Sequence, residues 1–173
     1  MDGVARIPVW RGGAVIAEAL VDKADEMLVI GWRWRLLNIG YVQAQRGEMY
    51  VYLHRLIAGA GPNTDVDHWN QNKLDNRSVN LRLCSSQQNS ANRQPDRRRL
   101  GTSSRHKGVC WDKSRERWAA YIHVNGKTRG LGRFDNEDEA ALAYNAAALA
   151  AWGQFARLND LNGGPLRSAS EQP

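Results

Sequence analysis

The dipeptide Asn125-Gly126 stands between two runs that alternate apolar and polar residues, Arg117–Val124 and Lys127–Phe134. Both central residues of a type I′ turn take a positive φ, which Asn and Gly tolerate better than other residues. The pattern therefore predicts a tight antiparallel hairpin. Lys107–Trp111 precedes it and predicts a third strand.

A helix is predicted directly after this hairpin. Asn136 and Glu139 have the spacing of a helix cap, and the helix is expected to run to Trp152 with Gly153 as its stop. One helix covers only one face of a three-stranded sheet. The sequence thus predicts an antiparallel sheet packed on one helix, with its second face open.

The charge distribution indicates what the open face binds. Residues 94–133 hold eleven Lys and Arg against three Asp and Glu, whereas residues 134–160 hold one against five. A basic block beside an acidic helix is typical of a nucleic-acid binder, although an ordinary solvated basic face gives the same count.

The segment before this block predicts a strand, a polar loop, a second strand and a helix. Val66–Trp69 and Val79–Cys84 are the strands, and Gln71–Arg77 is rich in turn formers. Ser85 and Gln88 form a Ser-x-x-Gln capping box at the start of the helix. Met49–Leu53 predicts a further strand, and His54–Gly59 a short helix.

The N-terminal residues are the least regular part of the sequence. Val21–Ile30 is consistent with a short helix, and Trp32–Leu36 and Gly40–Gln45 with strands. Two Trp at strand spacing favour a core role over stacking on nucleic acid. We predict an α+β chain, divided into an N-terminal strand and helix extension (1–47), a strand–loop–strand–helix core (48–93), a basic linker (94–103), a sheet-and-helix domain (104–160) and a flexible tail (161–173).

Four polar side chains in the second segment have the chemistry of a one-metal nuclease. Strand neighbours point to opposite faces, so Asp67 can face a metal ion while His68 faces a water molecule. Asn89, one turn inside the helix, can supply an amide oxygen as a second hard ligand. Asn80 completes the catalytic set by hydrogen-bonding the loop backbone. A merely polar, Asn-rich loop is the alternative.

The strings LHRLIAG, VDHWNQNKLDNRSVNLR and SSQQNSANR resemble the HNH endonucleases of phage and intron-encoded homing enzymes, a ββα-metal fold. The resemblance implies that His68 is the general base, that Asp67 and Asn89 bind metal, and that Asn80 is structural. Gln71 departs from the pattern because similar proteins often have glycine there. Structural support of the site is assigned to His54, Arg55 and Asn76.

The strings HKGVCW, RWAAYIHV, GLGRF and EAALAYNAAALAAWGQFARLN resemble the plant ethylene-response-factor (AP-two) DNA-binding domain. The resemblance implies that Lys107, Tyr121 and His123 face DNA. Cys110 and Gly130 replace an arginine and a tryptophan, so base reading by arginine is partly absent. The other predicted DNA contacts are basic residues: Arg77, Arg82, Arg97, Arg98, Arg99, Arg105, Lys113, Arg115, Arg117 and Lys127.

Together these patterns predict a metal-dependent endonuclease for double-stranded DNA. Mg²⁺ is the expected ion, with Mn²⁺ as a substitute; Cys84 and Cys110 are two separate thiols without a CxxC partner and cannot form a four-ligand zinc site by themselves. The alternatives are a DNA-binding regulator with a relic nuclease domain and a metal-dependent RNase. With no signal peptide or membrane span, we expect an intracellular protein, in a bacterial host if phage- or intron-encoded. The oligomeric state stays open, with a monomer favoured.

Overall fold

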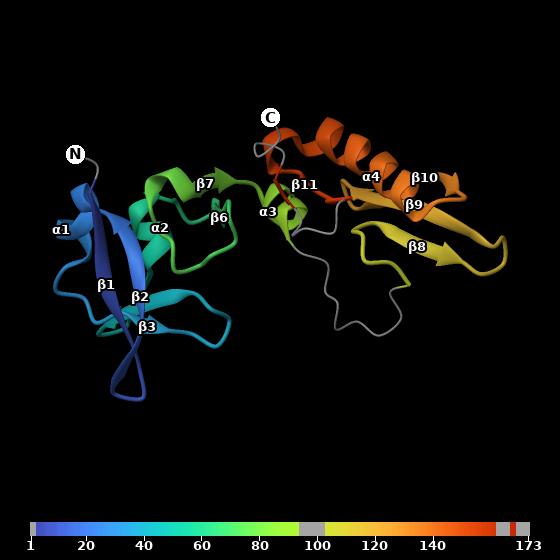
Figure 1. The fold of residues 1–173 in the computed structure, drawn as a ribbon. Coiled ribbons are helices and arrows are strands. Elements are labelled where there is room, and N and C mark those ends of the chain that lie inside the picture. Colours follow the sequence, from blue (N-terminus) through green and yellow to red (C-terminus); the bar gives the residue numbers. More distant parts are fainter. Residues whose placement is uncertain (1–2, 94–102, 162–166, 169–173) are drawn as a thin grey trace. The chain divides into compact units, whose positions relative to one another are not determined.

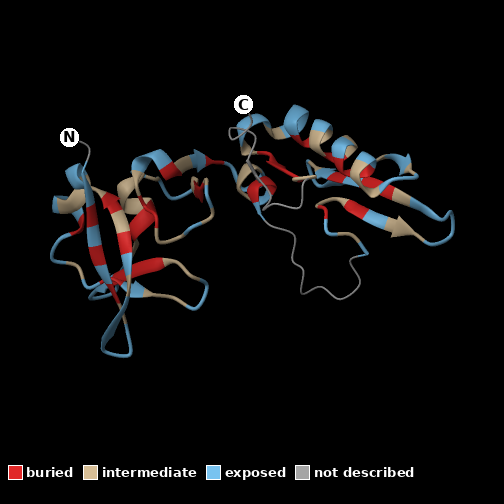
Figure 2. Cartoon of the chain, viewed as in Figure 1, coloured by how far each residue is buried: buried red, intermediate tan, exposed pale blue. Residues whose placement is uncertain are grey.

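The computed structural model describes residues 3–93, 103–161 and 167–168. The chain divides into two compact units, Met1–Ser85 and Ser86–Pro173, each with its own hydrophobic core (Figures 1 and 2). Both units mix strands and helices, so the predicted α+β class is confirmed. Residues 94–102 lie outside the described part, and with them most of the predicted linker and the arginines Arg97, Arg98 and Arg99.

Unit 1 begins with a hairpin that the sequence analysis did not predict. Its strands are β1 (Val4–Arg11) and β2 (Ala14–Asp22), joined at Gly12-Gly13. The alternate residues Ala5, Ile7 and Val9 are buried, which is the signature of a half-buried strand. Pro8 interrupts that pattern in the sequence and hides it.

The predicted helix over Val21–Ile30 is wrong in its first half. Val21 is the second-last residue of β2, where it is fully buried and pairs with Ala5. A 3₁₀ turn, η1 (Lys23–Asp25), leads into a short helix, α1 (Glu26–Val29). Burial of Val21 in the sheet outweighs the local helix signal.

Three further strands complete the first sheet in the order β2-β1-β3-β4-β5. The strand predicted over Trp32–Leu36 is shorter, since β3 covers only Arg35–Leu36; β4 is Val42–Arg46 and β5 is Met49–Tyr52. Trp34 directly precedes β3, and its carbonyl accepts from Trp10 N of β1 at 2.9 Å. It is buried, and its indole Nε1 donates to the Val29 carbonyl at 3.0 Å, so the predicted core role is correct.

The remaining elements of unit 1 follow the predicted order. They are α2 (Leu53–Ile57), β6 (Asp65–His68), the 3₁₀ turn η2 (Ser78–Asn80) and β7 (Leu81–Cys84). The second strand thus starts two residues later than predicted. Val79 is exposed and Asn80 N donates to Arg77 O at 2.9 Å, so both residues belong to the turn.

The polar loop between β6 and β7 is fastened to the edge of β2. Leu20 N donates to Leu74 O, and Asn76 N donates to Leu20 O, both at 2.7 Å. Ser78 N donates to the Asp22 carboxylate at 2.7 Å. The N-terminal hairpin therefore holds residues 69–77, which form no helix or strand.

Unit 2 consists of a short helix, a three-stranded sheet and a long helix. The helix α3 (Ser86–Asn92) follows β7, and the sheet has the order β10-β9-β8, with β8 (Val109–Asp112), β9 (Arg117–Val124) and β10 (Lys127–Phe134). The helix α4 (Glu137–Trp152) packs on the sheet (Figure 1). A 3₁₀ turn, η3 (Gly153–Phe155), leads to β11 (Arg157–Leu158), which pairs with β12 (Arg167–Ser168).

The strands and the long helix predicted for this unit are found, except that β8 begins at Val109 rather than Lys107, and the short strand β12 lies inside the predicted flexible tail. Asn125 and Gly126 have φ values of 52° and 75°, as a type I′ turn requires. The side chain of Asn136 accepts from Asp138 N, and Gly153 caps the other end of α4. Gly108 accounts for the late start of β8: its φ is 75°, and a Cβ there would lie 2.1 Å from Tyr144.

Candidate active site and DNA-binding face

The predicted general base, His68, ends β6 and is buried. Its Nε2 lies 3.2 Å from Asn76 Oδ1. An amide oxygen can only accept, so Nε2 carries the proton and Nδ1 keeps the lone pair. Burial lowers the pKa of His68, although Asn76 and Asp67 oppose the shift. The imidazole is therefore neutral near pH 7, the form that can accept a proton.

Aromatic rings surround His68. The His54 ring lies 5.2 Å from it and the Tyr41 ring 6.0 Å, and Tyr52 lies 5.7 Å from His54. Lys73 Nζ sits 4.1 Å above the Tyr41 ring and donates to Ile39 O at 2.7 Å. Burial, with His68 as the next cause, lowers the pKa of His54 to about 3. The sequence analysis found His54 but missed Tyr41, Tyr52 and Lys73.

The predicted metal ligand Asp67 faces Arg82 across the β6–β7 pair. The two side chains form an ion pair, with exposed fractions of 7% for Asp67 and 14% for Arg82. A carboxylate this buried needs a positive charge nearby. Arg82, predicted to contact DNA, provides that charge here.

Asp75 is a residue that the sequence analysis missed. It is buried, and Arg77 donates to it through Nε and a terminal nitrogen, both at 2.7 Å. Asn70 Nδ2 donates to the same carboxylate at 3.0 Å. The Arg77 guanidinium is the main reason that the pKa of Asp75 is lowered. Arg77, predicted to contact DNA, thus braces the loop, and its spacing of two from an acid was the available signal.

The remaining predicted residues of unit 1 hold backbone groups. Asn80 accepts from Asn70 N at 2.9 Å and donates through Nδ2 to Asp75 O at 2.6 Å. Arg55 donates to Thr64 O at 2.7 Å and also to Gly61 O, which fixes the turn before β6. These are the bonds expected of residues that support a site.

Asn89 lies on α3 and therefore belongs to unit 2, whereas Asp67, His68 and Asn80 belong to unit 1. The donor set fits a hard divalent cation, since a carboxylate and an amide oxygen are the ligand types that Mg²⁺ takes. Within residues 3–93, 103–161 and 167–168, no group of three or more His, Cys, Asp and Glu could hold a metal ion. The pairing of Asp67 with Asn89 stays a prediction.

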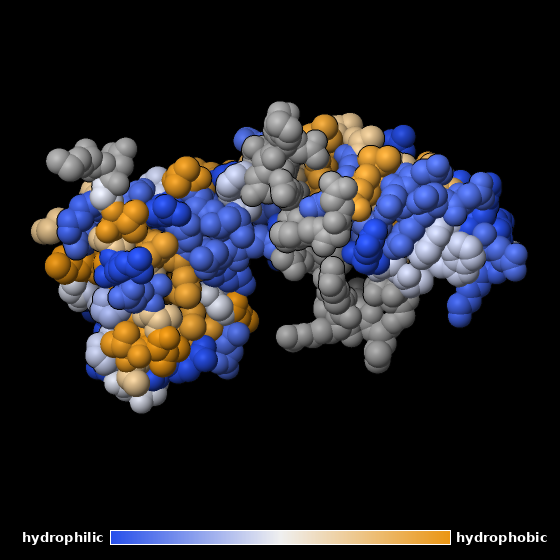
Figure 3. Space-filling view, viewed as in Figure 1, coloured by the Kyte–Doolittle hydropathy of each residue, from blue (hydrophilic) through white to orange (hydrophobic). Residues whose placement is uncertain are grey.

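The open face of the unit 2 sheet exposes Tyr121 and His123, as the alternation in β9 predicts. Several of its predicted phosphate contacts form surface ion pairs instead. Arg117 donates twice to Asp135 at 2.7 Å, Arg115 lies 3.5 Å from Asp112, and Arg105 lies 3.2 Å from Asp138. Lys113 and Lys127 are exposed. In Figure 3 the visible surface over β8 to β10 is mostly hydrophilic.

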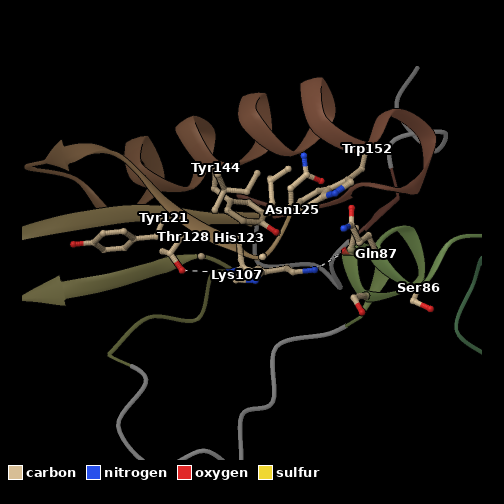
Figure 4. Close-up of a pocket in the computed structure, with 15 residues that line it drawn as sticks. Ser86, Gln87, Lys107, Tyr121, His123, Asn125, Thr128, Tyr144 and Trp152 are labelled. Carbon is tan, nitrogen blue, oxygen red and sulfur yellow. Dashed lines mark hydrogen bonds between the residues drawn. The ribbon is translucent and has the colours of Figure 1, made fainter.

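Lys107 is placed differently from the other predicted DNA contacts. Its Nζ lies at the end of α3, where it donates to Ala91 O (Figure 4). It also donates to Arg93 O at 2.9 Å. Burial, helped by Arg157, lowers the pKa of Lys107 to about 8. Lys107, Tyr121 and His123 all line a cavity of about 610 Å³ that α3 closes on one side.

No helix in the described part of the chain is long and apolar enough to cross a membrane.

Comparison with known proteins gives two domain matches and one relative. Residues 51–91 match the HNH endonuclease family model, and residues 104–154 match the AP2 domain model. An uncharacterized HNH endonuclease, L560, of Acanthamoeba polyphaga mimivirus is 35% identical over 157 residues, which is 88% of this chain and 79% of the relative. No solved structure matches.

Proposed function

The chain belongs to the HNH endonuclease family and carries an AP2 DNA-binding domain, and on that premise we propose that it hydrolyses phosphodiester bonds of double-stranded DNA with a divalent metal ion. The observation that carries the proposal is His68: a buried, neutral imidazole, oriented by Asn76, beside the carboxylate of Asp67. In an ordinary polar surface loop these side chains would be solvated, and they would be neither buried nor held in one orientation.

In the proposed reaction His68 Nδ1 takes a proton from water as the water oxygen attacks phosphorus. The bond from phosphorus to the leaving oxygen breaks, and that oxygen gains a proton from solvent. Asn76 keeps Nε2 protonated and the ring fixed, so that Nδ1 faces the water in the basic form. The neighbouring rings of Tyr41 and His54 restrict other ring orientations.

Asp67 and Asn89 are the proposed ligands of the ion, and Mg²⁺, or Mn²⁺ in its place, suits their oxygens. The bound ion would supply positive charge to offset the charge that develops on the phosphate and the leaving oxygen. For Asp67 to act in this way, Arg82 must share the carboxylate or release it. Arg82 is then free to approach a phosphate, which reconciles its observed partner with its predicted one.

Unit 2 is proposed to bind the DNA duplex. The exposed residues Tyr121 and His123 of its open sheet face, together with Lys127 beside the hairpin turn, are the proposed contacts with DNA. We also propose a homing-type enzyme that cuts at few sites, on the resemblance carried by LHRLIAG, VDHWNQNKLDNRSVNLR and SSQQNSANR.

Cleavage of supercoiled plasmid tests the proposal. The full chain should nick or cut it with Mg²⁺ or Mn²⁺ and stop in EDTA, and His68→Ala should slow cleavage by roughly 100- to 10,000-fold. DNA binding of the variant in EDTA should equal that of the wild type. Intact plasmid with every divalent ion would instead favour a regulator with a relic nuclease domain.

The same preparation distinguishes the remaining alternatives. Duplex DNA should be cut faster than single-stranded or duplex RNA, and the opposite preference would indicate an RNase. Sequencing of the ends produced from a complex DNA pool should give a small set of sites. Ends spread evenly over the pool would contradict the homing-type role.

A further inference from the structure

The outer face of the unit 1 sheet has no assigned role. The HNH match begins at residue 51, whereas β1 to β4 lie before it. The inner face of this sheet packs on the unit 1 core through residues such as Val9, Val21 and Val42. The face opposite that core is rich in arginine and aromatic side chains.

Strand pairing places these side chains on one surface. Trp10 on β1 pairs with Arg35 on β3, Arg35 pairs with Gln43 on β4, and paired residues point to the same side. The Arg33 guanidinium lies 4.7 Å from the Trp10 ring, and that of Arg35 lies 5.8 Å from the Tyr50 ring. These cation–π contacts hold the guanidinium groups over the sheet.

The arginines surround a depression of about 400 Å³ that is lined by Trp10, Arg11, Gly12, Gly13, Arg33, Arg35, Leu36 and Gln45. Within the described part of the chain, none of the ion pairs found involves Arg11, Arg33 or Arg35. Residues 28–47 contain no Asp or Glu. Arg35 donates to Gln43 Oε1 at 3.0 Å, and Arg11 donates to Leu36 O and Leu37 O at 3.5 Å. Three guanidinium groups thus line one depression without a carboxylate partner among the ion pairs found, which suits it to an anion.

The same face leads to the candidate active site. Tyr50 and Tyr52 are alternate residues of β5 and so lie on one side of the strand. The Tyr52 ring lies 6.3 Å from Tyr41, and Tyr41 lies 6.0 Å from His68. Ring contacts therefore lead from Tyr52, on the same side of β5 as Tyr50, to the proposed general base inside unit 1.

We propose that this face, defined by Trp10, Arg11, Arg33, Arg35 and Tyr50, binds the DNA backbone beside the phosphate that is cut. Guanidinium groups pair with phosphate oxygens through two parallel hydrogen bonds, and Trp10 and Tyr50 keep Arg33 and Arg35 oriented for this. The choice of DNA rests on the proposed nuclease function, because ring contacts lead from the side of β5 that carries Tyr50 to His68. Through this face unit 1 contacts the DNA substrate directly, in addition to the contacts proposed for unit 2.

The salt dependence of DNA binding by the full chain, measured in EDTA, tests the proposal. Each lost phosphate contact lowers the slope of log K against log salt by about 0.9, so R33Q/R35Q should lower it by about 2. The matched control, R6Q/R46Q, removes two charges outside the depression, where Arg6 pairs with Glu18 and Arg46 lies over Trp32. Its slope should stay that of the wild type.

A third variant separates charge from folding. R33K/R35K keeps both charges and should keep the wild-type slope. If R33Q/R35Q binds with the wild-type slope, or if the lysine variant loses as much as the glutamine variant, the proposal is overturned. A chain that cuts no DNA with any metal ion refutes the proposed nuclease function, and the slopes still decide whether this face binds the backbone.

Discussion

The two units use the same kind of ion pair in opposite surroundings. In the candidate active site Asp75 and Arg77 form a two-point pair whose side chains have exposed fractions of 3% and 33%. The exposed fractions of the paired Asp67 and Arg82 side chains are 7% and 14%. On the unit 2 sheet Arg117 and Asp135 form a similar two-point pair with exposed fractions of 46% and 80%. The chemistry is shared, and only burial differs.

This difference separates two tasks. A buried ion pair is costly to break and fixes the backbone around it, which suits a loop that must hold a catalytic histidine in place. An exposed pair is weak and exchanges its partner readily, which suits an arginine that must turn to a phosphate. Unit 1 is built for fixed geometry, and the unit 2 sheet for adaptable contact.

The largest effect is expected at Asp67 and Arg82. Arg82→Gln leaves a buried carboxylate without its cation and should lower the free energy of unfolding of unit 1 by about 4 kcal/mol. If Asp67 binds metal, Mg²⁺ or Mn²⁺ should restore part of this loss, because the ion replaces the guanidinium. Hydrogen exchange of unit 1 amides, with and without the metal, measures both effects.

Wild-type protein is the control, since its Asp67 already has a cation. Metal should stabilise the variant more than the wild type. Equal stabilisation of the two would remove Asp67 from the metal site.

The next prediction compares the two-point pairs directly. Asp75→Asn leaves Arg77 without a counter-charge and should cost about 3 kcal/mol, whereas Asp135→Asn at the exposed pair should cost less than about 1 kcal/mol. Hydrogen exchange of each unit's amides measures the two changes in the same way. Similar costs at the two sites would show that burial does not separate the units.

The carboxylate of Asp75 should also make the stability of unit 1 depend on pH in the acid range. The pKa of Asp75 is lowered from 3.8 by Arg77, so the folded state binds its proton less readily than the unfolded state. Its stabilisation is therefore complete above pH 3.8 and is lost as the pH falls through the lower folded value. Below pH 3.8 the wild type should lose stability faster than Asp75→Asn.

Sequence patterns predicted the elements of unit 2 well because its signals are local. Asn125-Gly126 specifies the turn, Asn136 caps α4 and Gly153 ends it. Each depends on a few neighbouring residues and needs no partner elsewhere in the chain. The start of β8 was wrong because it depends on the close approach of Gly108 to Tyr144, and the pairing of β11 with β12 was missed because both strands are only two residues long.

Unit 1 was harder to predict because its signals come from distant residues. The position of Asp67 and His68 at a strand end follows from local alternation. The loop that follows them is held by hydrogen bonds to Leu20 and Asp22. Ser78, whose N–H donates to Asp22, is 56 residues away from it in the sequence. Arg82 looks like a phosphate contact in sequence because its partner Asp67 is fifteen residues away and is found only through the β6–β7 pairing, and the burial of the nearer pair, Asp75 and Arg77, is likewise visible only in the fold.

A smaller effect is expected at Lys107, a residue of unit 2 whose side chain is only partly buried. Its pKa is lowered from 10.5 to about 8, so between these values the unfolded state binds more protons and wild-type stability should rise with pH. Lys107→Met should remove this rise in unit 2. At pH 7 the lost hydrogen bonds and the removed buried charge offset each other to within about 1 kcal/mol.

DNA binding by the same variant shows whether Lys107 also contacts phosphate. Lys127→Met, at an exposed position of the hairpin, is the matched control and should lower the salt slope by about 0.9. Lys107→Met should leave the slope unchanged as long as Nζ stays with Ala91 O and Arg93 O. A drop equal to that of Lys127→Met would place Lys107 on the DNA.

The smallest effect is expected at Gln71, a non-glycine residue that takes a positive φ in a turn of unit 1. Gln71 has a φ of 63° and its N–H donates to His68 O at 2.9 Å, whereas the unit 2 turn meets the same need with Asn125 and Gly126. The left-handed conformation costs an L-residue about 1–2 kcal/mol, and glycine loses about 0.5–1 kcal/mol through its extra freedom when unfolded. Gln71→Gly should therefore stabilise unit 1 by less than about 1 kcal/mol. Gln45→Gly, in the extended strand β4, should destabilise the same unit by about 0.5–1 kcal/mol. Thermal unfolding of both variants measures the contrast, and the same sign for both would mean that backbone strain at Gln71 is offset by contacts of its side chain.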